Sequence, residues 1–422
     1  MKNPAKISSS ATLLQIAIGL CFVSAPLQAG DWPQWRGLNR DAKAAGFDAP
    51  KTWPKELAQK WKVTVGLGDA TPALVGDKLY VFARQEGDEV ILCLDATTGK
   101  TFWQEKYEAQ GATGPASGHS GPRSSPAVAE GKVVTLGVRG TLTCLDAATG
   151  KKLWRKEGAP SDWPQFFTSS SPLIVDGLCV AQLGGPSSGA IVGYDLATGN
   201  EKWKWNGDGT AYSSPVLLTA GGVKAIVAET DKNIVAIGVA DGKLLWQTPY
   251  AGRGMGGYNA ATPIVDGQTL FYCGSGRGTK SVKFEKRGDA FAANELWTNV
   301  EKSVQFNTPV LKNGLLYGLT QGNELFCINA QNGQTAWSAP AAGAGVEGGR
   351  GRGGFGSIVD AGSVLLALTP ASEMIVFQPS DKAYAEMARI KVADTPTHAY
   401  PVIAGNRLFI KDKESLTLWT ID

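Results

Sequence analysis

The chain is poor in the residue types on which most catalytic and metal sites depend. Its 422 residues include two histidines, His119 and His398, and its six cysteines form no Cys-x-x-Cys pair. We therefore expect no metal site, because structural zinc sites take four Cys or His ligands at short spacings. No nucleophile-elbow motif accompanies either histidine, so a Ser–His–Asp hydrolase is not indicated and we expect no catalytic residues.

An excess of one charge and long apolar runs are also missing. The formal net charge is +3 and 19% of the residues are charged, which gives no bias towards polyanions, so we expect no nucleic-acid partner. The one long apolar run, 11–25, is too short to span a bilayer comfortably. It predicts a signal peptide over 1–29, cleaved near Ala29, and an exported protein, periplasmic or extracellular, without a transmembrane segment. Cys21 leaves a lipoprotein as the alternative.

Glycine, by contrast, is abundant, with 53 residues, and it recurs in a repeated motif. The stretch "CLDAATGKKLW" at 144–154 has counterparts at 93–103 and 327–337. Its tryptophan recurs seven times, at Trp61, Trp103, Trp154, Trp203, Trp246, Trp297 and Trp337. A Ser/Thr-Pro marker opens most units, and from Pro72 to Pro401 the seven intervals average 47 residues. A period of 40–50 residues with strand-like content predicts a β-propeller or a similar array.

Each unit reads as four short strands, as in 127–129, 133–138, 142–146 and 153–156. The all-β prediction is an eight-bladed propeller over 59–422, preceded by an arm over 30–58. The last unit lacks the fourth strand, which carries the tryptophan in most other units. The segment 59–65 around Trp61, at the other end of the chain, has the character of such a strand. We expect this N-terminal strand to complete the eighth blade and close the ring.

The repeated motif itself is interpreted as structural. The Asp side chain can bond the backbone two residues on, and the Gly supplies the positive φ that a tight turn needs. The tryptophan then lies on the outer strand, where its ring can dock one blade on the next. The cysteines at 93, 144 and 327 occupy one repeat position, which places them too far apart for disulfides and predicts buried, apolar packing.

Repeats of the form L-D-A-x-T-G-K-x-x-W resemble the pyrroloquinoline-quinone (PQQ) type β-propeller repeat, and the resemblance covers about residues 59–422. That family includes PQQ-dependent dehydrogenases and non-catalytic propellers such as the BamB subunit of the outer-membrane β-barrel assembly machinery. The leader "DWPQWRG" at 31–37 is similar to the start of bacterial secreted PQQ-like propellers, and its structural interpretation is an arm packed across the propeller.

The resemblance implies one of two functions. We favour an exported, non-catalytic scaffold with a protein partner, in envelope protein assembly like BamB, and with no cofactor. The alternative is a PQQ-dependent alcohol or sugar dehydrogenase, which would hold PQQ on Ca²⁺ with funnel carboxylates and Asn. The chain lacks the adjacent Cys pair found in many such dehydrogenases, and its expected funnel residues supply one carboxylate, Asp69. Hard-cation sites generally take more oxygen ligands.

The loops predict which face of the propeller is the working one. Turns between the first two strands of each unit are short, whereas 104–124, 155–170, 247–261 and 338–356 on the opposite face are long. Long loops on a rigid scaffold usually carry function. Seven of the thirteen arginines fall on this face, namely Arg84, Arg123, Arg139, Arg253, Arg277, Arg350 and Arg352. We expect the ligand or partner to contact residues that enter the funnel near the axis: Arg123, Tyr212, Asn259, Gln305, Asn307 and His398.

Overall fold

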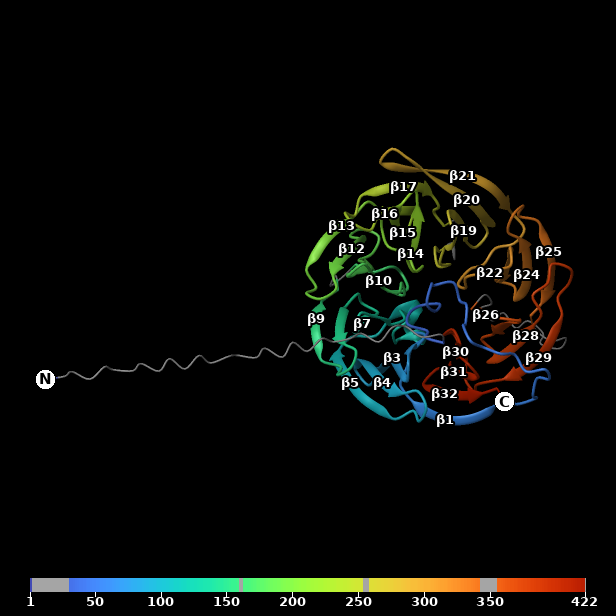
Figure 1. Ribbon diagram of the computed structural model, residues 1–422, viewed down its shortest axis with the longest axis horizontal. Helices are drawn as coiled ribbons and strands as arrows, with labels where there is room; N and C mark the ends of the chain where they lie inside the picture. The colour runs from blue at the N-terminus through green and yellow to red at the C-terminus, as the bar shows by residue number, and fades with distance from the viewer. Residues whose placement is uncertain (2–29, 159–161, 253–257, 342–354, 422) are drawn as a thin grey trace.

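The chain forms a ring of eight antiparallel sheets, each of four strands, around a central axis (Figure 1). The computed structural model describes residue 1 and residues 30–158, 162–252, 258–341 and 355–421. The prediction of an eight-bladed propeller is confirmed. Residues 2–29 of the expected signal peptide, together with Arg253, Arg350 and Arg352, lie outside the described residues.

The blades follow one another along the chain, and in blades 1 to 7 the strands run in sequence order from the axis outwards (Figure 1). Blades 1 and 2 comprise β2 (Ala73–Val75), β3 (Lys78–Gln85), β4 (Asp88–Asp95), β5 (Thr101–Glu108), β6 (Ala127–Ala129), β7 (Lys132–Leu136), β8 (Leu142–Asp146) and β9 (Lys152–Lys156). Blades 3 and 4 comprise β10 (Leu173–Val175), β11 (Leu178–Leu183), β12 (Ala190–Asp195), β13 (Glu201–Trp205), β14 (Val216–Ala220), β15 (Val223–Glu229), β16 (Asn233–Gly238) and β17 (Leu244–Pro249). Blades 5 and 6 comprise β18 (Ile264–Asp266), β19 (Thr269–Cys273), β20 (Thr279–Arg287), β21 (Ala290–Asn299), β22 (Val310–Lys312), β23 (Leu315–Leu319), β24 (Glu324–Asn329) and β25 (Thr335–Pro340). Blade 7 comprises β26 (Ser357–Ala361), β27 (Val364–Leu368), β28 (Glu373–Phe377) and β29 (Glu386–Lys391).

The eighth blade joins the two ends of the chain. It contains β30 (Val402–Ala404), β31 (Arg407–Lys411) and β32 (Ser415–Thr420), and its outer strand is β1 (Ala58–Thr64). β1 runs antiparallel to β32, with Val63 opposite Leu416 (Figure 1). The predicted closure by the N-terminal strand is therefore confirmed, and the eighth blade has four strands like the other seven.

Each repeated motif forms a turn and a contact with the preceding blade. In blade 2 the Asp146 carboxylate accepts hydrogen bonds from the backbone N–H groups of Ala148 and Thr149. Gly150 has a φ of +74°, and the Trp103 ring of blade 1 covers the space where its side chain would be. The Trp103 indole Nε1 donates to the Ala147 carbonyl at 3.3 Å. The same indole–carbonyl bond joins Trp61 to Ala96, Trp154 to Leu196, Trp203 to Val239, Trp297 to Ala330 and Trp337 to Ser380.

Blade 5 departs from the repeat. Asp289 precedes Trp297 by eight residues, the spacing of the motif's Asp from its Trp, but here it lies in the turn between Arg287 and Ala290 that joins the long strands β20 and β21. Trp246 of blade 4 instead packs edge-on against Phe284, with ring centroids 4.8 Å apart. In this blade the tryptophan of the preceding blade therefore packs against Phe284, whereas in blades 1 to 4 and 6 it packs against the motif glycine.

The Ser/Thr-Pro marker has a structural role near the axis. The hydroxyl group of one blade accepts a hydrogen bond from the backbone N–H of the equivalent residue in the preceding blade. These bonds run from Tyr400 to Thr71, Thr71 to Ser125, Ser125 to Ser171, Ser171 to Ser214, Ser214 to Thr262 and Thr262 to Thr308. These hydrogen bonds between neighbouring blades give partners to buried backbone N–H groups near the axis.

The N-terminal arm fills the centre of the ring from the short-turn face. Asp31 accepts a hydrogen bond from the backbone of Gly76, in the turn between β2 and β3, and Trp32 pairs with Leu74. Further along the arm, Arg36 and Arg40 are almost fully buried. Arg36 donates to the Thr308 and Pro309 carbonyls, and Arg40 to the carbonyls of Ser171, Pro172 and Pro215. The two guanidinium groups thus bind carbonyls from several different blades.

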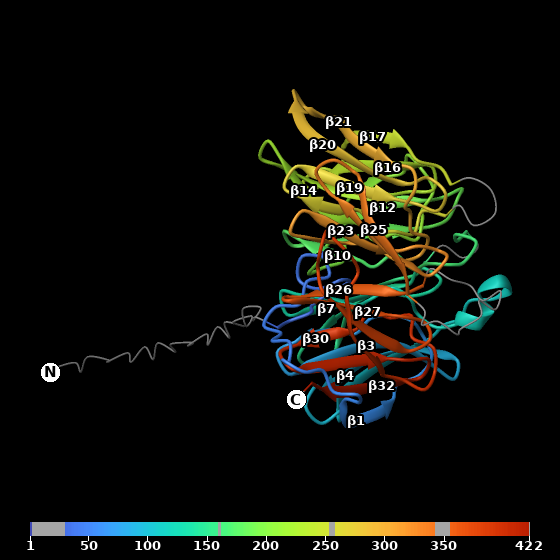
Figure 2. The same cartoon turned by 90° about the vertical axis from the view of Figure 1, so that its right-hand side faces the viewer.

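The opposite face carries the long connections and the short 3-10 helix η1 (Gly114–His119). In the side view the arm lies on one face, and η1 projects from the other as a coiled ribbon (Figure 2). Within the described ranges no helix has the length and apolar character needed to cross a membrane. The cysteines at 93, 144, 179, 273 and 327 are free and buried.

Candidate functional site

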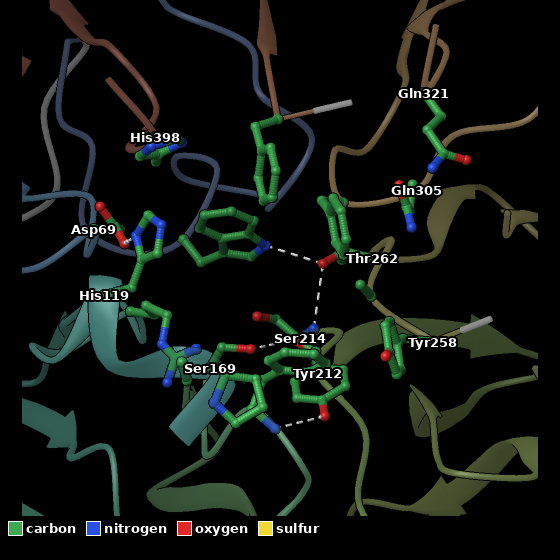
Figure 3. Close-up of a pocket in the computed structure, with 18 residues that line it drawn as sticks. Asp69, His119, Ser169, Tyr212, Ser214, Tyr258, Thr262, Gln305, Gln321 and His398 are labelled. Atoms are coloured by element: carbon green, nitrogen blue, oxygen red, sulfur yellow. Dashed lines mark hydrogen bonds and ion pairs between the residues drawn. The ribbon is translucent and has the colours of Figure 1, made fainter. Parts of the chain in front are cut away.

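The candidate site is a cavity of about 480 Å³ on the long-loop face, at the axis of the ring (Figure 3). Connections between all eight blades contribute to it, so the scaffold fixes its walls from every side. The lining residues are Trp35, Asp69, Pro115, Ala116, His119, Arg123, Phe166, Ser169, Tyr212, Ser214, Tyr258, Ala260, Thr262, Gln305, Phe306, Gln321, Phe355 and His398.

Aromatic rings form much of the wall. Phe166, Tyr212 and Tyr258 contact one another through tilted or edge-on rings, with centroids 5.1 to 6.2 Å apart. Across the cavity Phe306 and Phe355 stack at 4.4 Å. Such a wall offers a large apolar surface at little cost in conformational entropy, because aromatic side chains have few rotatable bonds.

Trp35 of the N-terminal arm reaches the cavity from the other side of the ring. Its indole Nε1 donates to Thr262 Oγ1 at 3.0 Å, and its ring packs edge-on against Tyr400. Because the arm approaches from the short-turn face, Trp35 forms the floor of the cavity. The arm therefore both blocks the central channel and gives the funnel a closed end.

Arg123 is the cationic group of the wall. It is largely buried, and its Nε and Nη2 atoms have no hydrogen-bond partner among the described residues. Burial lowers the pKa of the Arg123 guanidinium, and the charge of Asp69 opposes that shift. Beside it, burial raises the pKa of Tyr212 to about 12, so this phenol stays neutral and accepts a hydrogen bond from the Phe166 N–H at 3.1 Å.

A second polar group lies where blades 8, 1 and 2 meet. Asp69 Oδ2 and His119 Nδ1 are 2.6 Å apart, and the rings of His119 and His398 pack edge-on with centroids 5.0 Å apart (Figure 3). Burial raises the pKa of Asp69, but the hydrogen bond and charge of His119 outweigh it, so that pKa lies below its usual value. Burial lowers the pKa of His398, which favours the neutral imidazole, and the Asp69 charge opposes this.

Four of the six predicted binding residues line this cavity: Arg123, Tyr212, Gln305 and His398. Asn259 and Asn307 are not among the lining residues. The Asn259 amide donates to the Thr230 and Tyr250 carbonyls, and the Asn307 amide donates to the Leu319 carbonyl. Their sequence position places them near the axis, but each side chain satisfies buried backbone oxygens.

The arginines of the long-loop face anchor the loops to the blades. Arg84 donates to the Ala109 carbonyl at 2.6 Å, and Arg139 donates to the carbonyls of Gln110 and Gly111. Arg277 donates to the Tyr250 carbonyl at 2.6 Å. Of the four arginines of this set that the structure describes, Arg123 alone lines the cavity. Most of the described arginines on this face therefore hold loop backbone in place and do not contribute to the cavity wall.

Sequence reasoning missed several lining residues. Trp35 lies in the arm, outside the repeat, and no periodic signal points to the cavity. His119, Phe166 and Tyr258 lie inside the long connections rather than next to an innermost strand. Loop length indicates the face on which the cavity lies, but it does not identify which side chains of a loop turn towards the axis.

The fold and the cavity define a class: an eight-bladed β-propeller whose long-loop face holds a blind, aromatic funnel. A family model described as "Outer membrane protein assembly factor BamB" matches residues 50–206 and 87–339. The chain belongs to this family of PQQ-like β-propellers.

The curated relatives fall into two groups. The chain is 25% identical to the outer membrane protein assembly factor BamB of Burkholderia pseudomallei over 252 residues, 57% of this chain and 59% of that protein. It is 29% identical to the quinohemoprotein alcohol dehydrogenase of Comamonas testosteroni over 158 residues, 36% of this chain and 22% of that enzyme. The matched region spans less than two thirds of the length of either relative.

Solved structures show the same architecture. BamB from Moraxella catarrhalis superposes with a TM-score of 0.59 at 17% identity, over 86% of this chain and 100% of that one. The quinohemoprotein alcohol dehydrogenase from Comamonas testosteroni superposes with a TM-score of 0.65 at 14% identity, over 93% of this chain and 80% of that one. At these identities the likeness establishes the fold alone.

The cavity is a poor match for PQQ held on Ca²⁺. Calcium takes six to eight oxygen ligands, mostly from carboxylates, carbonyls and water. Among the described residues that line the cavity Asp69 is the one carboxylate, and it is bonded to His119. The two asparagines expected near the axis, Asn259 and Asn307, are not among the residues that line the cavity, and their amide nitrogens donate to backbone carbonyls. The donor set therefore does not fit a calcium-borne quinone, although the cavity is large and aromatic.

Proposed function

We propose that this chain is an exported, non-catalytic binding protein that holds a protein partner at the mouth of its funnel. Its place in the BamB-like family, whose relatives are named as outer membrane protein assembly factors, supports a task in envelope protein assembly. The apolar, signal-like run at 11–25 supports export.

The observation that carries this proposal is Arg123 in an aromatic cavity. Its Nε and Nη2 atoms have no acceptor among the described residues, and a buried polar group without a partner costs about 1–3 kcal/mol or more. A carboxylate from a partner would supply the acceptor, because the guanidinium fork matches carboxylate geometry. Phe166, Tyr212 and Tyr258 would cover an apolar side chain next to it. The partner feature is thus a carboxylate, from Asp, Glu or a chain terminus, beside an apolar residue.

The size of the cavity agrees with such a use. Ligand cavities commonly have volumes of about 300–1,000 Å³. At about 480 Å³ the funnel has room for two or three side chains of an inserted segment, but not for a folded domain. The surrounding long connections would contact the rest of the partner. Tyr and Arg are also enriched among interface residues whose truncation costs at least about 2 kcal/mol.

Site-specific crosslinking tests the proposal. A photoreactive residue at Gln321, which lines the cavity, is compared with one at Asp77 in the short turn between β2 and β3. In envelope extracts we expect partner adducts from position 321, and we expect the Arg123→Ala/Tyr212→Ala double variant to reduce them at least tenfold. A matched double variant on the turn face, Asp77→Ala/Asp266→Ala, should leave them unchanged. Adducts confined to the turn face and insensitive to the funnel variant would refute the proposal.

A reconstitution experiment tests the dehydrogenase alternative. The purified protein is mixed with PQQ and Ca²⁺, and its absorbance and dye-linked oxidation of alcohols and sugars are measured. Because the described part of the funnel offers one carboxylate, and that group is bonded to His119, we expect no saturable cofactor binding and no turnover. Stoichiometric PQQ binding with turnover would replace the scaffold proposal by the enzymatic one.

A further inference from the structure

The chain's two histidines occupy one site. His119 ends helix η1 and His398 precedes β30, so they are far apart in sequence, yet their rings lie with centroids 5.0 Å apart. Asp69, which precedes β2, completes the group through its contact with His119. One ligand atom from each of the three side chains can be chosen so that all lie within 4.8 Å of one another.

The surroundings of His398 point to a missing partner. Its Nδ1 atom is buried and has no hydrogen-bond partner among the described residues. Histidines that serve only as packing groups normally have their ring nitrogens satisfied, because an orphaned buried polar atom costs free energy. Here the nitrogen lies beside a second imidazole and a carboxylate, and all three side chains line an open cavity. A cation that accepts the lone pairs of both rings would satisfy the site.

We propose that Asp69, His119 and His398 bind one divalent transition-metal ion of the zinc class. Two imidazoles and one carboxylate are ligands that zinc and its neighbours in the first transition row accept, whereas calcium and magnesium prefer oxygen ligands. Metal–ligand bonds of about 2.0–2.2 Å hold ligand atoms roughly 3–3.5 Å apart. Modest side-chain rotations would therefore bring the three groups from their present separation to coordinating distance.

The scaffold favours such a site. Asp69 and His398 each precede the innermost strand of a blade, and blades 1 and 8 are neighbours at the closure of the ring. The Asp69 backbone N–H donates to the Pro122 carbonyl at 2.8 Å, which ties it to the connection that carries His119. The Asp69–His119 hydrogen bond holds both side chains in place, and coordination would replace it. Sites built on rigid elements hold their ligands more precisely than sites on free loops.

Three protein ligands leave at least one coordination position for a molecule from the cavity. Zinc sites with three protein ligands keep a fourth position for water or an exogenous ligand. This proposal departs from the expectation of no metal site, which rested on the small number of histidines and on the absence of a Cys-x-x-Cys pair. It also stands apart from the proposed partner binding, because the metal is measured on the purified protein without any partner.

Zinc titration of the purified mature chain tests the proposal. The protein, with its purification tag removed, is stripped with a chelator and titrated with Zn²⁺ by calorimetry. We expect about one ion per chain, and at least a tenfold weaker affinity in His119→Ala and in His398→Gln. Gln321→Ala, which changes another lining residue of the same cavity, should bind Zn²⁺ as the parent does. Thermal unfolding of each metal-free variant checks that it is folded.

Two further measurements make the result decisive. Co²⁺ in place of Zn²⁺ should give visible absorption bands in the parent protein that the His398→Gln variant lacks. A parallel titration with Ca²⁺ should show at least tenfold weaker binding than with Zn²⁺. The proposal is overturned if the folded parent binds no stoichiometric Zn²⁺, if both histidine variants bind it equally well, or if Ca²⁺ binds as tightly.

Discussion

The indole of Trp61, in the first strand of the propeller, lies against Gly99 of blade 1, so close that a Cβ atom on Gly99 would come within 3.0 Å of the ring. The same indole packs near Phe409 of blade 8, with centroids 6.0 Å apart. One side chain from the N-terminal strand therefore contacts both the last blade and the first. This is the position at which the ring closes.

Removing that ring should weaken the closure. We expect Trp61→Ala to lower the free energy of unfolding by about 3 kcal/mol, near the lower end for a truncated tryptophan because Trp61 is half-buried. Phe102→Ala is the control, since Phe102 also lies on an outer strand but is 55% exposed and should change stability by about 0.5 kcal/mol or less. Chemical denaturation measures both. Equal stability of the two variants would contradict the closure model.

Substituting two glycines of blade 2 distinguishes the cost of backbone strain from the cost of a clash with a tryptophan ring. Gly150 and Gly131 have similar φ values of +74° and +70°, so alanine is strained at either position. A Cβ on Gly150 would lie 2.5 Å from the Trp103 ring, whereas one on Gly131 would meet nothing within 4 Å. We expect Gly131→Ala to cost about 1 kcal/mol and Gly150→Ala about 1–3 kcal/mol more. Similar melting temperatures for the two variants would show that Trp103 does not require the glycine.

The repeat explains why the fold could be predicted so fully. Each Asp–Gly–Trp motif encodes a turn and an inter-blade contact locally, so its recurrence fixes the number of blades. The last repeat lacks an outer strand after Ser415–Thr420, and the strand around Trp61 belongs to no other repeat. Together these two features predict that the N-terminal strand completes the eighth blade. The exception is blade 5, because Phe284 replaces the glycine and the motif is lost in a longer hairpin.

The candidate site could be predicted only in part. Arg123 and Tyr212 could be predicted from their position just before an innermost strand, which brings a residue close to the axis, and both line the cavity. Asn259 and Asn307 hold the same position but do not line the cavity. Their side-chain rotamers are set by buried backbone carbonyls that need a hydrogen-bond donor, which the sequence does not reveal. The floor residue Trp35 depends on the path of the arm through the ring, which is a tertiary property that no repeat encodes.

The arm should contribute strongly to stability through Arg40. Its guanidinium donates to three backbone carbonyls of blades 3 and 4, and burial lowers its pKa to about 9, so it remains charged at neutral pH. Arg40→Met should lower the free energy of unfolding by about 3–5 kcal/mol, because buried carbonyls lose their donors. Arg287→Met, at an exposed hairpin tip, should change it by about 0.5 kcal/mol or less. Comparable denaturation midpoints would mean that the arm is not held by this residue.

A buried carboxyl group in blade 4 makes stability depend on pH. Glu229 is 0% exposed, and its two carboxyl oxygens have no hydrogen-bond partner among the described residues. Burial raises the pKa of Glu229 well above its usual value, and the nearby charge of Arg277 only partly opposes this. The folded protein therefore keeps this proton at pH values where the unfolded chain has lost it.

The sign of the effect follows from that difference in bound protons. Above the unfolded-state pKa of about 4.3, stability should fall as the pH rises, by up to about 1.4 kcal/mol per pH unit, until Glu229 ionises in the folded state. Glu229→Gln removes this contribution, so the variant should gain stability relative to the parent between pH 5 and pH 8 and match it near pH 4. Glu295→Gln, at an exposed position, should follow the parent throughout. Urea denaturation at each pH gives the difference, and parallel profiles for the parent and Glu229→Gln would show that Glu229 is ionised in the fold.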